Sequence, residues 1–212
     1  MIALNDIKKA YGSKIILNNI DLKIDNGEFV VISGLSGSGK STLINIIGHL
    51  DTADEGFVKI NGRVYSSKKE LRELRKNYFG YIFQNYALID NETVETNLML
   101  AVEDKGNKKE KIKQVLSKVG LENSILTLKI NQLSGGEQQR VAIARVLLKP
   151  FQTILADEPT GNLDNKNKEE IFKLLKSIQG SGKTVICVSH DMDIQKYADK
   201  IISLENENLI IT

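Results

Sequence analysis

Apolar and polar positions near the start of the chain follow the pattern of β-strands. Residues 15–24 alternate in part between apolar and polar side chains, as expected of a half-buried antiparallel strand, and residues 2–8 are a shorter, mixed strand candidate. Residues 29–32, FVVI, are continuously apolar and predict a strand buried on both faces. Residues 56–65 predict a hairpin, because Asn61-Gly62 is a strong two-residue turn signal.

Further along the chain, the spacing of the apolar residues changes to the one typical of helices. Residues 41–50 carry one apolar stripe, and residues 93–148 are mostly helical in period. After a strand at 78–83, the last third alternates: strands at 153–156, 184–189 and 201–204, and helices at 168–179 and 193–198. Such alternation predicts a mainly parallel sheet with helices on both faces. The expected fold is one α/β core with an N-terminal antiparallel β lobe and an inserted α-helical subdomain.

Composition narrows the class of protein. The chain has 212 residues, which suits one domain, and its 41% hydrophobic and 26% charged residues are ordinary for a globular protein. A net charge of +2 gives no strong attraction to nucleic acid, so we expect no nucleic-acid partner. The single cysteine, Cys187, excludes an intrachain disulfide and favours a reducing compartment. We expect no signal peptide, and no membrane helix, which would need about 18–20 apolar residues in a row.

Residues 34–41, GLSGSGKS, match the phosphate-loop pattern G-x-x-x-x-G-K-[ST] at every fixed position. Glycines let the backbone curl so that its N–H groups point at phosphate oxygens, and the following helix N-terminus favours anions. A plain glycine-rich turn is the alternative, but the strand before the loop and the helix after it are the context that the motif requires. The residues expected to bind nucleotide here are Gly34, Ser36, Gly37, Ser38, Gly39, Lys40, Ser41 and Thr42. We expect Lys40 to reach the β- and γ-phosphates and Ser41 to ligate Mg²⁺.

Acidic residues follow another predicted buried strand, in residues 153–158, TILADE. Asp157 is the candidate on the metal side and Glu158 the candidate that polarises the attacking water. Two carboxylates directly after an apolar strand are costly unless a cation or partner is near, which disfavours a plain acidic surface turn. His190 follows the strand at 184–189 and should emerge at the same sheet edge, although a lone histidine is more often structural. Gln84 ends the strand at 78–83, where it could touch both the metal and the γ-phosphate.

A second glycine-containing turn lies at residues 133–140, LSGGEQQR, before a helix predicted at 138–148. Ser134 is a good N-cap, and Glu137 three residues later makes a capping box a valid local interpretation. Gly135 and Gly136 are poor helix formers and make sense if the turn lies close against a ligand. The helix N-terminus would be a second anion site. A head-to-tail dimer would then pair this turn of each chain with the phosphate loop of the other.

This turn resembles the signature motif of the ATP-binding cassette (ABC) ATPases, and the resemblance extends over essentially the whole chain in family order. It implies a P-loop NTPase (RecA-like) fold, ATP hydrolysis by a dimer of two copies, and ATP and Mg²⁺ as cofactors. The resemblance implies that Tyr11 stacks on adenine, that Gln84 is the Q-loop glutamine with a metal contact, and that Ser134, Gly135 and Gly136 contact the γ-phosphate. It also implies that Asp157 is the Walker B aspartate, that Glu158 is the catalytic glutamate, that Asp164 belongs to the D-loop and that His190 is the switch histidine.

The same resemblance implies one cassette over residues 1–212, with the β lobe at about 1–30 and 56–66, the helical subdomain at about 88–148 and the core in the remainder. Residues 156–164, ADEPTGNLD, resemble the branch of macrolide exporters, lipoprotein-release ATPases and peptide or bacteriocin exporters. Members of this branch pair with permeases encoded as separate chains, which implies a cytoplasmic protein held at the inner face of the plasma membrane.

Residues 83–94, FQNYALIDNETV, look especially like ATPases of lactococcin-972-type bacteriocin exporters of Gram-positive bacteria. One departure from the family follows: Thr96 stands where the family usually has glutamate before the asparagine, here Asn97. That stretch faces the permease in relatives, so the departure concerns partner identity rather than catalysis.

The leading function is a transport ATPase that drives export of a peptide, bacteriocin, drug or lipoprotein. An ABC ATPase that moves a membrane partner without substrate transport remains an open alternative. ABC proteins acting on ribosomes or DNA carry two cassettes or a long coiled-coil insertion, whereas Lys40 and Ser134 are 134 − 40 = 94 residues apart here without sustained heptads. A degenerate nucleotide-binding module is disfavoured because no catalytic position is substituted.

Overall fold

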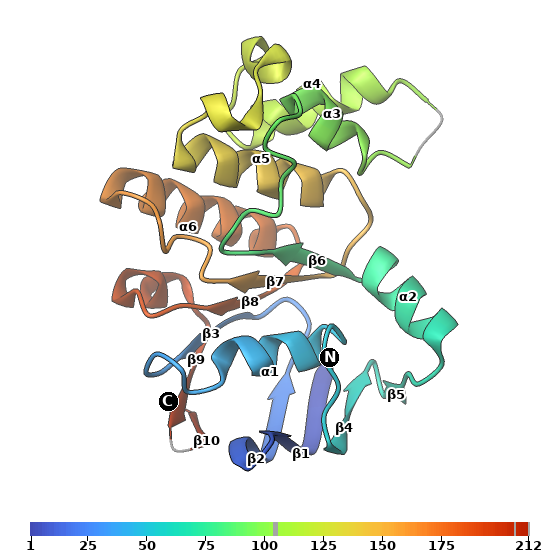
Figure 1. The fold of residues 1–212 in the computed structure, drawn as a ribbon, viewed down its shortest axis with the longest axis vertical. Coiled ribbons are helices and arrows are strands. Elements are labelled where there is room, and N and C mark those ends of the chain that lie inside the picture. The colour runs from blue at the N-terminus through green and yellow to red at the C-terminus, as the bar shows by residue number, and fades with distance from the viewer. Residues whose placement is uncertain (104–105, 206, 212) are drawn as a thin grey trace.

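The fold is described from a computed structural model, which covers residues 1–103, 106–205 and 207–211 (Figure 1). Its first sheet is antiparallel, with strand order β2-β1-β4-β5. The strands are β1 (Ile2–Tyr11), β2 (Lys14–Ile24), β4 (Glu55–Ile60) and β5 (Arg63–Val64). Asn61 and Gly62 join β4 to β5 with φ angles of 51° and 80°, the left-handed pair that a two-residue hairpin turn needs. The predicted antiparallel lobe and its hairpin are confirmed.

The second sheet has six strands in the order β10-β9-β3-β8-β7-β6. They are β3 (Phe29–Ser33), β6 (Phe79–Ile82), β7 (Thr153–Asp157), β8 (Thr184–Val188), β9 (Lys200–Glu205) and β10 (Asn208–Ile211). The five strands from β9 to β6 pair in parallel, as the alternation of strands and helices predicted. The sequence did not predict β10, which pairs antiparallel with β9 at the edge of the sheet.

Strand β3 lies between two hydrophobic cores. Phe29 and Val31 belong to the core formed with helices α3 to α6, whereas Val30 and Ile32 belong to the core formed with α1 and the antiparallel sheet. Because successive side chains of a strand point to opposite faces, a continuously apolar strand is needed where both faces are covered. The predicted burial of this strand on both faces is confirmed.

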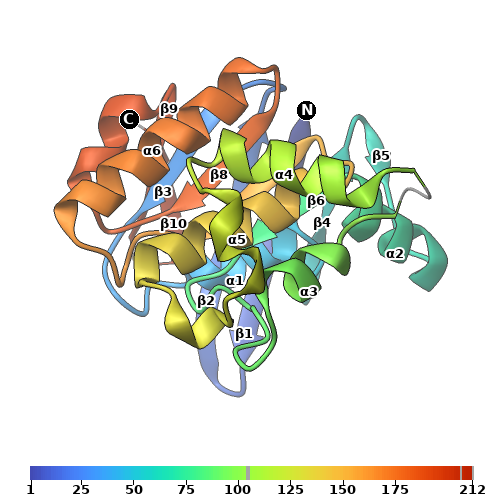
Figure 2. The same cartoon turned by 90° about the horizontal axis from the view of Figure 1, so that it is seen from above.

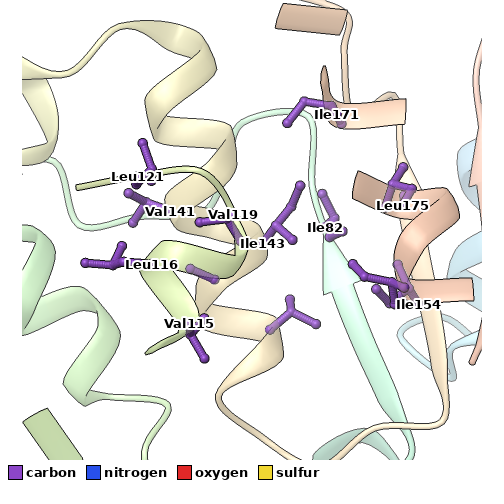
Figure 3. Packing of buried hydrophobic residues seen from close by; sticks show 14 of the residues in the cluster. Ile82, Val115, Leu116, Val119, Leu121, Val141, Ile143, Ile154, Ile171 and Leu175 are labelled. Carbon is purple, nitrogen blue, oxygen red and sulfur yellow. The ribbon is translucent and has the colours of Figure 1, made fainter. Parts of the chain in front are cut away.

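Helix α1 (Lys40–Ile47) lies between the two sheets, and α5 (Gly135–Leu147) and α6 (Asn165–Gly180) cover the other face of the six-stranded sheet (Figure 1). Seen from above, α4 lies over α5 and the sheet (Figure 2). Ile82 of β6, Ile143 of α5 and Ile171 of α6 point into one cluster (Figure 3). The remaining elements of this region are α3 (Val94–Met99), α4 (Lys108–Lys118), and the 3₁₀ turns η1 (Asn123–Thr127) and η2 (Ile130–Gln132).

Three local predictions differ from the structure. Helix α1 ends at Ile47 rather than residue 50, because His49 takes a left-handed φ of 55°. Residues 193–198 belong to a 3₁₀ helix, η3 (Met192–Tyr197), instead of an α-helix. The structure also contains α2 (Lys68–Asn77), which the apolar period did not predict because most of its residues are charged. Its signal was the capping box, in which Ser67 and Glu70 bond reciprocally.

None of the helices in the part of the chain that the structure describes is both long and apolar enough to cross a membrane.

Candidate active site

The loop between β3 and α1 is built on glycines that its backbone requires. Gly34, Gly37 and Gly39 have φ angles of 142°, 78° and 102°, all in the region that disfavours other residues. A Cβ at residue 34 would lie 2.5 Å from the Leu204 carbonyl oxygen, and one at residue 39 would lie 2.7 Å from the Ile16 side chain. The loop is therefore held in a curled conformation at the N-terminus of α1, where the first N–H groups of a helix are free to meet an anion.

Lys40 lies under this loop rather than out in solvent. Its ammonium donates to the carbonyl oxygens of Gly34 (3.0 Å) and Leu35 (2.7 Å), and the residue is 7% exposed. Ser38 Oγ, also in the loop, is buried without a hydrogen-bond partner among the described residues. A cation and an unpaired hydroxyl thus lie together in the loop, at the N-terminus of α1, which suits a phosphate.

The next pair of residues comes from α1 and β7. The Ser41 hydroxyl donates to Asp157 Oδ1 at 3.0 Å, so the two predicted metal donors are brought together. Burial raises the pKa of Asp157, and the nearby charge of Glu158 raises it further, whereas the Ser41 hydrogen bond and the charge of Lys40 oppose the shift. A partly desolvated carboxylate of this kind gains from a nearby cation.

These donors fit Mg²⁺. Magnesium is bound by one or two carboxylates together with hydroxyl, water and phosphate oxygens, rather than by a cage made entirely of protein. Within residues 1–103, 106–205 and 207–211, no group of three or more His, Cys, Asp or Glu gathers in a way that could hold a metal. The Ser41 and Asp157 oxygens therefore match a Mg²⁺ that shares its coordination with a nucleotide.

Glu158 and His190 follow β7 and β8 and meet at the same sheet edge. His190 Nδ1 lies 2.9 Å from Glu158 Oε2, an ion-pair distance when the imidazole is protonated. Glu158 has a left-handed φ of 47°, and its N–H donates to the Val188 carbonyl at 3.0 Å, which fixes this unusual backbone to β8. The carboxyl ends of parallel strands meet at one edge, so two side chains distant in sequence share one place.

Gln84 lies at the same edge, after β6. It lines one cleft together with Asp157 and Asn162. The chain then passes through Tyr86 and Ala87, which have left-handed φ angles of 61° and 49°. Arg145 of α5 donates to the carbonyl oxygens of both residues and so ties the segment after Gln84 to that helix.

The turn at residues 133–136 begins α5, three residues earlier than predicted. Ser134 and Glu137 form the capping box: the Ser134 N–H donates to Glu137 Oε2 at 2.8 Å, and Ser134 Oγ accepts from the Glu137 N–H at 3.4 Å. A Cβ at Gly136 would lie 2.1 Å from Asn167 Oδ1 of α6. Within the chain, the close approach predicted for this glycine is therefore made to helix α6.

Asp164 caps α6 and is joined to the same turn. It accepts from the Asn167 backbone at 2.9 Å and from the Asn167 side chain at 2.8 Å. Arg140 of α5 donates to Asn167 Oδ1 at 3.1 Å and to Glu170 at 2.8 Å. Sequence reasoning missed Asn167 and Arg140; the spacing of Asp164 and Asn167, that of an N-cap and its N3 position, was the available signal.

Tyr11 ends β1 and is 53% exposed, and its hydroxyl donates to Asp51 at 2.6 Å. This hydrogen bond is the main reason that the pKa of Tyr11 is raised, and the Thr42 hydroxyl opposes the shift. Tyr11 and Thr42 are therefore neighbours, which places an exposed aromatic ring beside the first turn of α1. Sequence reasoning missed Asp51.

Comparisons with known proteins agree with this geometry. The family model described as ABC transporter matches residues 17–161. An uncharacterized ABC transporter ATP-binding protein of Methanocaldococcus jannaschii, MJ1508, is 44% identical, and the match covers 99% of this chain and 98% of that protein. The macrolide export ATP-binding/permease protein MacB of Pasteurella multocida is 43% identical over 99% of this chain. The chain spans 34% of the length of that protein, about a third.

Solved structures lead to the same family. A dimeric structure of MJ0796, a bacterial ABC transporter cassette, superposes with a TM-score of 0.88 at 41% identity and covers 99% of this chain and 96% of that chain. A post-hydrolysis state of the same cassette, bound to ADP and Pi, has a TM-score of 0.89 at 39% identity with the same coverage. The predicted P-loop NTPase fold is confirmed, and the chain belongs to the ABC transporter family as an ATP-hydrolysing, nucleotide-binding cassette of the macrolide-exporter branch.

Proposed function

We propose that two copies of this chain close head to tail around two MgATP molecules and drive a separate membrane permease. The observation that carries this proposal is the sheet edge beside the phosphate loop, where Ser41 is paired with Asp157 and Glu158 with His190. The signature turn begins α5, across the six-stranded sheet from α1 (Figure 1). A second copy can supply that turn, and MJ0796 has been solved as a dimer.

In this proposal each residue acts through position and charge. The γ-phosphate is held by Lys40 and His190 of one chain and by Ser134, Gly135 and Gly136 of the other. Ser41, Asp157 and Gln84 would hold Mg²⁺, which when bound would neutralise charge on the phosphates. Glu158 orients and deprotonates the attacking water, Tyr11 stacks on adenine, and Asp164 contributes to the dimer contact.

We extend the proposal to the whole chain: a single cassette over residues 1–212, with a β lobe at about 1–30 and 56–66 and a helical subdomain at about 88–148. The cassette would be cytoplasmic and peripheral, held at the inner face of the plasma membrane by its permease.

Ser134→Arg tests the shared site. The arginine would place a long side chain where the phosphate of the other chain must approach, so we expect hydrolysis to fall about 10²-fold or more, the effect of losing one charge-stabilising contact. ATP binding by the monomer should stay within about twofold of wild type, because binding rests on the phosphate loop. The measurements are steady-state phosphate release and isothermal titration with ATP.

Ser67→Arg is the matched control, because Ser67 caps α2 through the same Ser/Glu capping box. Both substitutions remove a cap, at a cost of about 1 kcal/mol of stability. Hydrolysis by the control should match wild type. If Ser134→Arg loses ATP binding as well as hydrolysis, Ser134 has a structural role and the shared-site model fails.

A groove next to the Gln84 segment suits the permease contact. It is lined by aromatic and aliphatic side chains together with two cationic ones: Tyr81, Phe83, Leu100, Ala101, Arg145, Val146 and Lys149. Leu100 is 67% exposed and lines this apolar groove, so its side chain is available to an apolar partner surface. Arg145 joins this groove to the segment after Gln84, so a permease here would be linked to the nucleotide edge.

Leu100→Glu is expected to abolish co-purification with the permease encoded beside this chain, when both are expressed together, because a charge would be buried against an apolar partner. Hydrolysis by the isolated chain should be unchanged. The exposed leucine Leu128, outside the groove, gives the control Leu128→Glu. Retained binding by Leu100→Glu would place the permease elsewhere.

The transport that we propose is export of a peptide, bacteriocin, drug or lipoprotein; the names of the macrolide export relatives support an exporter, and the lactococcin-972-type assignment stays a prediction. Mechanical action on a membrane partner without transport is the alternative. The extracytoplasmic part of the partner would decide between transport and mechanical action. A small secreted peptide encoded beside the permease would favour bacteriocin export.

A further inference from the structure

A buried lysine stands next to the aromatic ring at the end of β1. Lys9 is 8% exposed, although lysine is rarely buried unless it is paired. Its ammonium donates to the Thr52 carbonyl at 2.8 Å and lies 3.3 Å from Asp54 and 3.4 Å from Asp51. The charge is therefore neutralised by the acidic segment that follows α1.

The same segment holds Tyr11. Its hydroxyl donates to Asp51 Oδ2 at 2.6 Å, and the ammonium of Lys9 lies over the ring, 5.1 Å from the centroid. Asp51 also accepts from the Thr52 N–H at 2.7 Å, so the carboxylate that anchors the phenol is itself fixed. On β1, Lys9 and Tyr11 are two residues apart, the spacing that puts side chains on one face of a strand.

The ring is thus held at its tip by a carboxylate and at one face by a cation, while about half of the Tyr11 surface stays exposed. An exposed tyrosine without such contacts would lose rotational freedom whenever a ligand ordered it, and that loss weakens binding. A ring ordered beforehand avoids it. A cation over one face adds a cation–π contact and directs any stacking partner to the open face.

We propose that Lys9 and Asp51 are positioning residues that fix the Tyr11 ring for stacking on the base of the nucleotide. The inference rests on the stacking role of Tyr11 in the proposed function. The cluster of Lys9, Tyr11 and Asp51 should therefore contribute to the affinity for ATP, but not to the affinity for a ligand that carries the phosphates without a base.

The test compares MgATP with magnesium tripolyphosphate, which carries the phosphates without a base, by isothermal titration. Tyr11→Phe keeps the ring and removes the anchor to Asp51, and Lys9→Met keeps the length of the side chain and removes the cation. Each should weaken ATP binding about two- to tenfold, the range expected when one side chain must be ordered on binding. Tripolyphosphate binding should remain at the wild-type value.

Lys8→Met is the matched control, because Lys8 lies on the same strand and pairs with Glu55 at 2.8 Å on the surface. It should change neither affinity. Tyr11→Ala, which removes the ring, should weaken ATP binding more than Tyr11→Phe. Thermal unfolding of each variant without nucleotide checks that the fold is retained.

Two results would overturn the inference separately from the rest. If Tyr11→Ala weakens ATP binding but Tyr11→Phe and Lys9→Met bind ATP as wild type does, the ring stacks without needing its anchor. If ATP and tripolyphosphate affinities fall in parallel, the cluster supports the fold rather than the base. If Tyr11→Ala leaves the ratio of the two affinities unchanged, the ring does not stack, and the adenine contact of the proposed function fails as well.

Discussion

Replacing Glu158 by glutamine should nearly stop hydrolysis and trap two chains around ATP. The amide keeps the size and the backbone of the residue, which matters because its φ of 47° is already strained. It removes the carboxylate that lies beside His190 and that we propose takes the proton from the attacking water. Loss of a general base lowers a rate by about 10²- to 10⁴-fold. In the proposed cycle ATP binding closes the dimer and hydrolysis reopens it, so the closed form should accumulate.

Size-exclusion chromatography with and without ATP measures the trapped dimer, and single-turnover phosphate release measures the chemical step. Glu122→Gln, an exposed glutamate outside the site, is the control and should elute and hydrolyse as wild type does. A Glu158→Gln protein that stays monomeric at saturating ATP contradicts the composite site. Hydrolysis close to wild type would instead remove Glu158 from catalysis.

Lys40→Ala should lose both ATP affinity and turnover. Charge-assisted hydrogen bonds contribute about 1.5–3 kcal/mol each, so ATP binding is expected to weaken at least about tenfold, and turnover to fall about 10²-fold or more. The substitution also removes the Lys40 hydrogen bonds to the Gly34 and Leu35 carbonyls, although the Leu35 carbonyl still accepts from the Ser38 N–H, so the loop itself is loosened. Titration with ATP and steady-state phosphate release give the two numbers.

Lys113→Ala, at an exposed position of α4, is the matched control for removing one lysine and should bind and hydrolyse ATP normally. Thermal unfolding with and without MgATP adds an independent measure, because the stabilisation by a ligand increases with the logarithm of its affinity at a fixed ligand concentration. If Lys40→Ala is stabilised by ATP as much as wild type, Lys40 does not hold phosphate.

The sequence predicted those parts of the site that depend on residues close together in the chain. The phosphate loop needs glycines at fixed spacing, and the acidic edge needs Asp157 directly after an apolar strand. His190 could be placed beside Glu158 because parallel strands end at a common edge, a rule that needs no knowledge of side-chain packing.

What the sequence did not predict depends on contacts between distant segments. Lys9 and Asp51 are 42 residues apart and meet because β1 lies alongside the chain that leaves α1. Gly136 looks like a ligand-binding glycine in sequence, whereas in the fold its missing side chain makes room for Asn167. The spacing of apolar residues did not predict helix α2, because Leu74 is its buried residue and most of its other residues are charged. The helical spacing of apolar residues predicts a buried helix face only when several apolar residues lie on that face.

The position of β3 has a consequence for motion. Its side chains are shared by both cores, and both of its edges are hydrogen-bonded, to β8 and to β9. A strand held in this way opens only when most of the domain unfolds, so its amides should be among the slowest to exchange with deuterium. The phosphate loop follows this strand directly. The loop that we propose to bind the nucleotide is therefore anchored at one end to a strand that should open only with the domain as a whole.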